Sequence, residues 1–136
     1  MIKYCSPGSS TKRALVLLFV LACSSAPPGP EPIPPGAACG GCRMAISNPR
    51  LAAQIVATGE EPIFFDDLGC LRAYEKRPSA IAYVADYQTG VWLDASTASY
   101  FRCDSIETPM SSHLIAVAPG QTLTNCETLV RGEGKP

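Results

Sequence analysis

The chain has 136 residues, of which 46% are hydrophobic and 17% charged, and its formal net charge is −1. This length fits one small domain, and the composition is that of an ordinary globular protein. The slight negative charge and the lack of a basic run exclude a protein that binds nucleic acid through its phosphates.

The first 22 residues have the pattern of a secretory leader. Lys12 and Arg13 precede an apolar run over residues 14–22, which is too short to span a bilayer as a helix. The run ends in a Leu-Ala-Cys triplet that resembles a bacterial lipobox, so we expect cleavage and lipidation at Cys23. An ordinary cleavage site with an incidental cysteine is the alternative. We therefore expect a membrane-anchored lipoprotein on the periplasmic side of a bacterial envelope, at the outer membrane.

Residues 23–38 join this anchor to the rest of the chain and are rich in proline between residues 27 and 35. Successive prolines favour an extended polyproline II conformation, which rises about 3.1 Å per residue. The segment is predicted to be a semi-rigid spacer that holds the domain off the membrane. An unstructured linker is the alternative.

The remaining pattern predicts one α+β domain over residues 39–128, built from two ββα-type halves. The first half is expected to have strands over residues 51–57 and 63–66, followed by a helix over residues 68–77. The second half is expected to have strands over residues 80–86 and 91–93, followed by a helix over residues 95–102. A last strand is expected over residues 114–118, and residues 129–136 should fray.

The cysteine count fits an exported protein. Seven cysteines are present, and five remain once Cys5 leaves with the leader and Cys23 carries lipid. Five is odd, so at least one thiol stays free. Cys103 and Cys126 flank the last predicted strand, and we expect a disulfide between them that ties down the C-terminal segment.

Two thiols and a thioether lie within six residues at Cys39-x-x-Cys42-x-Met44. Thiolate and thioether sulfur are soft ligands, and together they favour Cu(I) over harder divalent ions. Three alternatives remain open for these residues. The cysteines could be a redox pair, they could bind zinc together with Cys70 and His113, or Cys39 could form a structural disulfide.

Two further positions are predicted to contribute to a metal site. Met110 follows a proline that restricts the approach of its loop, so it could deliver a second thioether; a Met that fills a core gap is the alternative. Asp66 could ligate copper or hydrogen-bond to a ligand. Asp67 is most simply a helix cap, and His113 most simply a bystander.

Four ordered motifs carry a resemblance to a known family. They are Cys39-x-x-Cys42-x-Met44, the segment over residues 64–71, the segment over residues 85–95, and Thr108-Pro109-Met110. In this order they resemble the NosL family, whose members are copper-binding lipoproteins accessory to nitrous-oxide reductase. The resemblance covers about residues 39–118.

The resemblance implies a periplasmic Cu(I) carrier rather than an enzyme, with a core similar to that of organomercurial lyase. It implies Cys42, Met44 and Met110 as copper ligands, and a copper-receiving enzyme such as nitrous-oxide reductase as partner. The chain departs from the family at Arg43 and Ser111, where the family usually has glycine. The rival classes are a dithiol redox enzyme and a structural lipoprotein stapled by disulfides without metal.

Overall fold

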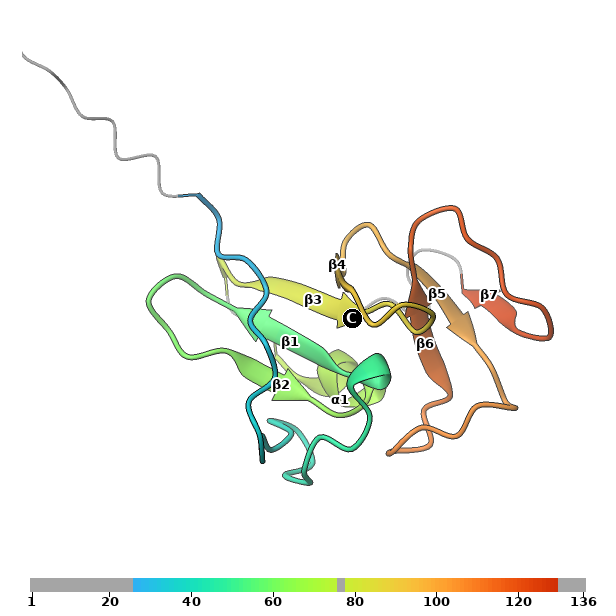
Figure 1. Cartoon of the computed structure of the whole chain (residues 1–136), viewed down its shortest axis with the longest axis horizontal. Helices are drawn as coiled ribbons and strands as arrows, with labels where there is room; N and C mark the ends of the chain where they lie inside the picture. The colour runs from blue at the N-terminus through green and yellow to red at the C-terminus, as the bar shows by residue number, and fades with distance from the viewer. Residues whose placement is uncertain (1–25, 76–77, 130–136) are drawn as a thin grey trace, which may run out of the picture.

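The computed structural model describes residues 26–75 and 78–129. Within these ranges it contains two antiparallel sheets, one α-helix and a short 3₁₀-helix, which confirms the α+β class (Figure 1). No helix in the described ranges is long and apolar enough to cross a membrane. The predicted leader and Cys23 lie outside the described residues.

The first sheet has four strands in the order β2-β1-β3-β4. They are β1 (Ala53–Val56), β2 (Ile63–Phe65), β3 (Ile81–Ala85) and β4 (Trp92–Asp94). Helix α1 (Leu68–Ala73) follows β2 directly, and the 3₁₀-helix (Pro49–Leu51) precedes β1. The order β1, β2, α1 along the chain is the one predicted for the first half.

The second sheet has three strands in the order β6-β5-β7. They are β5 (Ser99–Arg102), β6 (Leu114–Val117) and β7 (Glu127–Leu129). The helix predicted over residues 95–102 was wrong, because a turn at Asp94 is followed by β5 instead. The hydroxyl of Tyr100 donates to the Ala95 carbonyl at 2.7 Å, and β5 pairs with both of its neighbours. Cross-strand pairing therefore overrides the local helix signal.

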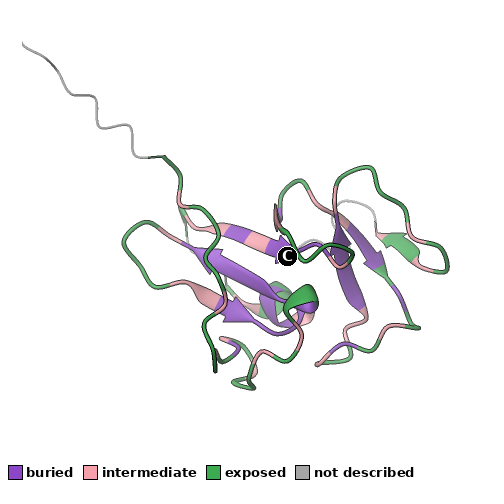
Figure 2. Ribbon diagram, viewed as in Figure 1, coloured by how far each residue is buried: buried purple, intermediate pink, exposed green. Residues whose placement is uncertain are grey.

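The two sheets share a core. A bridge joins Asp86, just after β3, to Ala116 on β6, and the Tyr87 N–H donates to the Ala116 carbonyl at 2.9 Å. β1 and β6 are buried along their whole length (Figure 2). The main cluster of buried side chains takes members from both sheets and from α1, including Ile55, Leu71 and Leu114. The two sheets therefore bury a common apolar surface. Because β3 and β4 belong to the first sheet, the structure does not divide into the two predicted ββα halves.

The proline-rich tether is not a free spacer over its described part. The side-chain amide of Gln54, fully buried on β1, accepts from the Glu31 N–H and donates to the Glu31 carbonyl, both at 2.9 Å. The Tyr83 hydroxyl on β3 donates to the Pro28 carbonyl at 2.9 Å. Pro28 and Glu31 are three residues apart, which is one turn of polyproline II, so both carbonyls face the sheet. Residues 28–31 form a strap across β1 and β3.

A disulfide joins Cys103 to Cys126, the pair named from the sequence. It connects the end of β5 to the residue before β7, beside a smaller apolar cluster that includes Phe101 and Ile115. The closed loop spans 23 residues, for which loop-closure entropy contributes about 3 kcal/mol. Leu129, the first residue of the predicted frayed tail, is the last residue of β7; residues 130–136 lie outside the described residues.

Candidate metal centre

A tight loop after the strap carries Cys39 and Cys42. The Cys39 N–H donates to the Met44 carbonyl at 2.7 Å, and the Arg43 N–H donates to the Cys39 carbonyl at 3.0 Å. The Gly40 N–H donates to the Phe64 carbonyl at 2.7 Å, which attaches the loop to the edge of β2. The loop turns at Arg43, whose φ of 68° lies in the left-handed region. These bonds fix where both thiols point.

Helix α1 supplies a third thiol from Cys70. Asp67 caps the helix, since its carboxylate accepts from the Gly69 N–H at 2.6 Å, and Cys70 lies in the first turn that follows. The helix packs tightly on the loop: a Cβ at Gly41 would lie 3.1 Å from the Cβ of Cys70. A glycine at position 41 thus lets the helix bring Cys70 against the cysteine loop.

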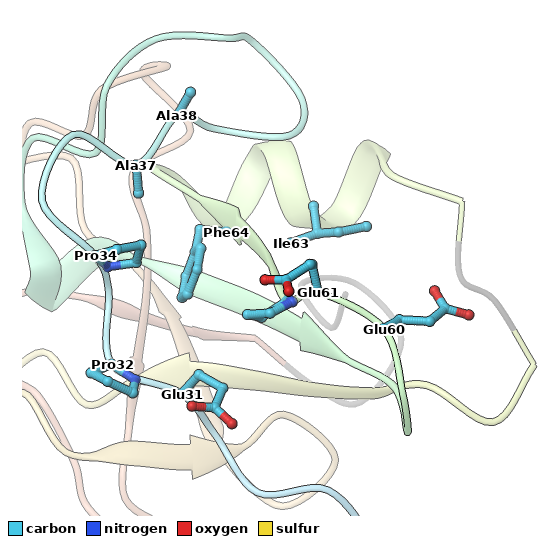
Figure 3. A pocket seen from close by; sticks show the side chains of 10 residues that line it. Glu31, Pro32, Pro34, Ala37, Ala38, Glu60, Glu61, Ile63 and Phe64 are labelled. Atoms are coloured by element: carbon cyan, nitrogen blue, oxygen red, sulfur yellow. The ribbon is translucent and has the colours of Figure 1, made fainter.

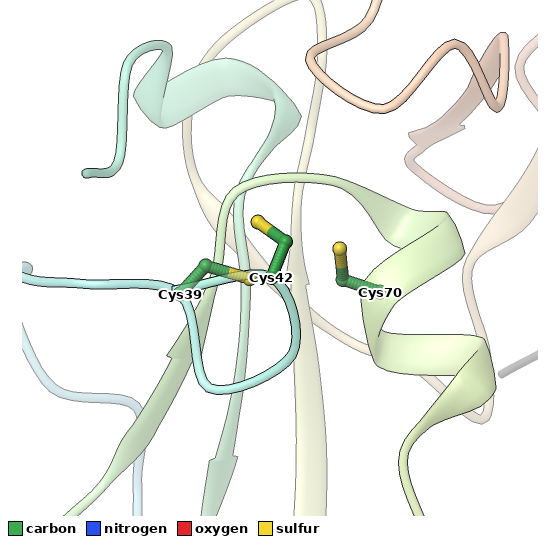
Figure 4. A group of neighbouring side chains, drawn as sticks. All are labelled: Cys39, Cys42 and Cys70. Carbon is green, nitrogen blue, oxygen red and sulfur yellow. The ribbon is translucent and has the colours of Figure 1, made fainter. Parts of the chain in front are cut away.

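The three sulfur atoms lie within 4.8 Å of one another (Figure 4). Figure 4 shows Cys39 and Cys42 on the loop and Cys70 on the facing turn of α1. Three thiolates that each lie about 2.3 Å from one metal ion stand about 4 Å apart. The cluster therefore fits a single ion bound by three sulfurs, with only small movements of the side chains. All three are free cysteines.

Their surroundings shift the pKa values of Cys39 and Cys70 in opposite directions. Burial raises the pKa of Cys39, but hydrogen bonds from backbone N–H groups outweigh burial and lower it below its usual value; the donors are Asp66, Cys42 and Gly41. Burial, and after it the neighbouring sulfurs of Cys39 and Cys42, raise the pKa of Cys70 to about 12. Cys39 is therefore the readier thiolate, while Cys70 keeps its proton until a cation replaces it.

A surface pocket of about 630 Å³ opens beside the cluster. Cys42 and Cys70 line it together with Met110, which arrives on the loop before β6, and the ring of Tyr74 forms part of the wall. Met110 is 46% exposed. The fold thus brings a thioether to the same pocket as two of the three thiols, although Met110 is 40 residues beyond Cys70.

The side chains of three other residues named from the sequence have other surroundings than the three thiols. Met44 is 55% exposed and does not line the pocket that Met110 lines. Asp66 is fully buried, and its carboxylate accepts from the N–H and hydroxyl of Ser47. His113 has its Nδ1 3.0 Å from the Ile106 carbonyl oxygen, so the described structure offers no cysteine–histidine set around Cys70.

Cys70 is the site residue that sequence reasoning undervalued. The sequence named it only as a partner of His113 in a zinc site. Its 28-residue separation from Cys42 gives no local spacing signal, and only the fold brings the two together. The usable signals were the odd cysteine count and the capped helix that places Cys70 in its first turn.

Known proteins offer no independent guide to this centre. No family model matches the chain, and neither does any curated protein or solved structure. The function proposed below therefore rests on the positions of the sulfur atoms and on the motifs in the sequence.

A second pocket, of about 660 Å³, lies between residues 31–38 and residues 60–64 at the start of β2 (Figure 3). Its polar side chains are the carboxylates of Glu31, Glu60 and Glu61, and its apolar wall includes Phe64. Carboxylates suit hard cations rather than Cu(I), and no thiol lines this pocket. Among the described residues, the thiols that suit a soft metal ion lie together in the cysteine cluster.

Proposed function

We propose that this protein binds Cu(I) through Cys39, Cys42 and Cys70 and passes it to a copper enzyme. The observation that carries the proposal is the approach of three free thiols to within 4.8 Å of one another, contributed by two separate elements of the fold. Copper is here the cargo of a carrier, and the chain itself catalyses no reaction.

Copper is favoured over zinc by the fourth group at the site. Closed structural zinc sites complete a tetrahedron with a fourth cysteine or a histidine. Here the pocket beside Cys42 and Cys70 offers the thioether of Met110, while the imidazole of His113 faces the Ile106 carbonyl. Three thiolates with a nearby thioether are a soft ligand set, which suits Cu(I). Met44, the other thioether named by the family resemblance, stays in the proposal as an additional ligand on the exposed side.

The two positions at which the chain departs from the NosL family, Arg43 and Ser111, have a backbone conformation that supports the resemblance. Arg43 has a φ of 68° and Ser111 a φ of 54°, and this left-handed region favours glycine. A family that usually has glycine at these positions would form the same two turns without strain. The ββα order of the first half also supports a NosL-like core, and we extend the proposal to delivery of copper to nitrous-oxide reductase or a related enzyme.

We further propose that the protein works as a lipoprotein on the periplasmic side of the envelope, anchored at Cys23 to the outer membrane. The leader pattern of residues 1–22 and the cysteine-rich composition support this location. The disulfide between Cys103 and Cys126 is the kind of bond that persists in an oxidising compartment.

Transfer proceeds by exchange of ligands. Cys42 and Met110 line the open pocket, whereas Cys39 is only 1% exposed. A thiolate or imidazole of the recipient entering the pocket therefore meets the Cys42 and Met110 side of the ion first, and Cys39 releases it last. Copper stays as Cu(I) throughout, so neither protein is oxidised or reduced.

The rival redox function is less well supported by the geometry. A C-x-x-C oxidoreductase needs a reactive thiol that is partly exposed in order to attack a substrate disulfide. The thiol with the lowered pKa here is Cys39, which is 1% exposed beneath the loop. A dithiol enzyme would also need neither Cys70 nor Met110.

Anaerobic titration of the reduced protein with Cu(I), against a chromophoric chelator, tests the proposal. We expect one Cu(I) per chain, with affinity lowered by Cys42→Ser and by Met110→Leu; the Met44→Leu variant measures what the exposed thioether adds. Insulin reduction by the same samples should be absent. Failure of the folded, reduced protein to compete for copper would reject the carrier function.

A further inference from the structure

Asp66 and Asp67 lie side by side at the junction between β2 and α1, and both are fully buried. Adjacent residues at the end of a strand point to opposite sides. Each carboxylate reaches a different one of the two loops that approach Cys70. A buried carboxylate is costly unless hydrogen bonds compensate it, so the partners of each one are informative.

Asp66 holds the cysteine loop. Its Oδ1 accepts from the Ser47 N–H at 2.6 Å and from the Ser47 hydroxyl at 3.1 Å, and its Oδ2 lies 3.2 Å from the same hydroxyl. Ser47 follows the loop that carries Cys39 and Cys42, and the Asp66 N–H itself hydrogen-bonds to the Cys39 sulfur. Both the backbone and the side chain of Asp66 thus fix this loop against the strand end.

Asp67 holds the methionine loop. Its Oδ2 accepts from the Met110 N–H at 2.9 Å, while its Oδ1 accepts from the Gly69 N–H at 2.6 Å. The Ser112 and Thr108 hydroxyls add further hydrogen bonds to the same carboxylate. One side chain therefore ties the start of α1, which carries Cys70, to the loop that carries Met110.

We infer that Asp66 and Asp67 are positioning residues that set the geometry of the metal site, Asp66 through Cys39 and Asp67 through Met110. The inference rests on the proposed copper-binding function, and it assigns Asp66 a role other than metal ligand. Both oxygens of a carboxylate accept hydrogen bonds. An amide at the same position has one accepting oxygen and one donating nitrogen. The two adjacent carboxylates therefore hold both ligand-bearing loops in place relative to Cys70.

A double-mutant cycle on Cu(I) affinity tests the assignment to Asp67. Asp67→Asn keeps an oxygen for the Gly69 N–H but turns a donor toward the Met110 N–H. Groups that orient metal ligands typically lower affinity 10- to 100-fold when mutated, so we expect about that loss in the wild-type background. In the Met110→Leu background the same change should cost less than about threefold, because the thioether it positions is already gone.

Two further variants serve as comparisons for Asp67→Asn in this cycle. Asp66→Asn should lower affinity by the same factor with and without Met110, since it acts through Cys39. Asp86→Asn should leave affinity unchanged, because Asp86 is a buried carboxylate that accepts from the Gln88 N–H away from the site. Equal losses from Asp67→Asn in both backgrounds, or coupling of Asp66 to Met110, would overturn the inference.

A readout on the metal-free protein separates this inference from the copper function. The ¹³C-labelled methyl group of Met110 should show contacts with protons of Tyr74 and other pocket residues in the wild type, and should lose them in Asp67→Asn but not in Asp86→Asn. If Asp67→Asn fails to fold, Asp67→Ser serves instead, because serine still caps α1 but has a single side-chain oxygen and cannot also accept from the Met110 N–H. Unchanged Met110 contacts in the variant that folds would reject the positioning role, whereas lost contacts in a protein that binds no Cu(I) would reject only the carrier function.

Discussion

Replacing Cys70 with serine tests whether α1 supplies a metal ligand. Cys70 is 8% exposed, and serine is close enough in size to remove the sulfur without leaving a large cavity. Residues that only support metal ligands typically cost 10- to 100-fold in affinity when mutated. Loss of one of three thiolates should therefore cost at least about 100-fold, which corresponds to about 2.8 kcal/mol of binding free energy.

The assay is competition with a chromophoric Cu(I) chelator under anaerobic conditions, with Cys42→Ser as the matched variant. Thermal unfolding of the metal-free proteins shows whether the serine disturbs the fold. We expect both variants to stay folded and to lose affinity by similar factors. Cu(I) affinity of Cys70→Ser within about threefold of the wild type would show that Cys70 is not a ligand, and would refute the three-sulfur site.

Three further outcomes follow from the same geometry. Because the Cys70 thiol has its pKa raised to about 12, Cu(I) must displace at least this proton at neutral pH, so apparent affinity should rise at least about tenfold per pH unit between pH 6 and 8; a flat profile would contradict this. Arg43→Gly relieves a φ of 68° and should stabilise the fold by about 0.5–1 kcal/mol in thermal unfolding, whereas a lower melting temperature would argue against strain there. Gln54→Leu removes both hydrogen bonds to the strap and should cost about 1–3 kcal/mol, with faster hydrogen exchange at the Glu31 amide; unchanged exchange would mean that the strap does not depend on Gln54.

The first half of the fold could be predicted because its signals are local. The turn residues before β2, the β-branched Ile55 and Val56 in β1 and the capping Asp67 each act within a few residues. The failure at residues 95–102 has a physical cause. The Ser96 and Thr97 N–H groups bond to Asp94 and form one turn, but Tyr100 and the residues after it gain more by pairing with β6 and β7.

The strap and the third thiol could not be predicted from local pattern. The strap depends on side chains of Gln54 and Tyr83 that bond to backbone 23 and 55 residues earlier, and proline content alone cannot distinguish a docked segment from a free one. Cys70 joins the loop only because α1 packs on Gly41. The soft ligand type was visible in the sequence, while the number of thiols at the site required the fold.

X-ray absorption at the copper edge, on the protein loaded with one equivalent of Cu(I), is the most direct test of the central claim. We predict at least three sulfur neighbours, with the three thiolates at about 2.3 Å, the usual metal–thiolate distance at zinc, and loss of one sulfur neighbour in Cys70→Ser. Two sulfur neighbours in a linear arrangement, with a spectrum unchanged by Cys70→Ser, would contradict a site built from all three cysteines.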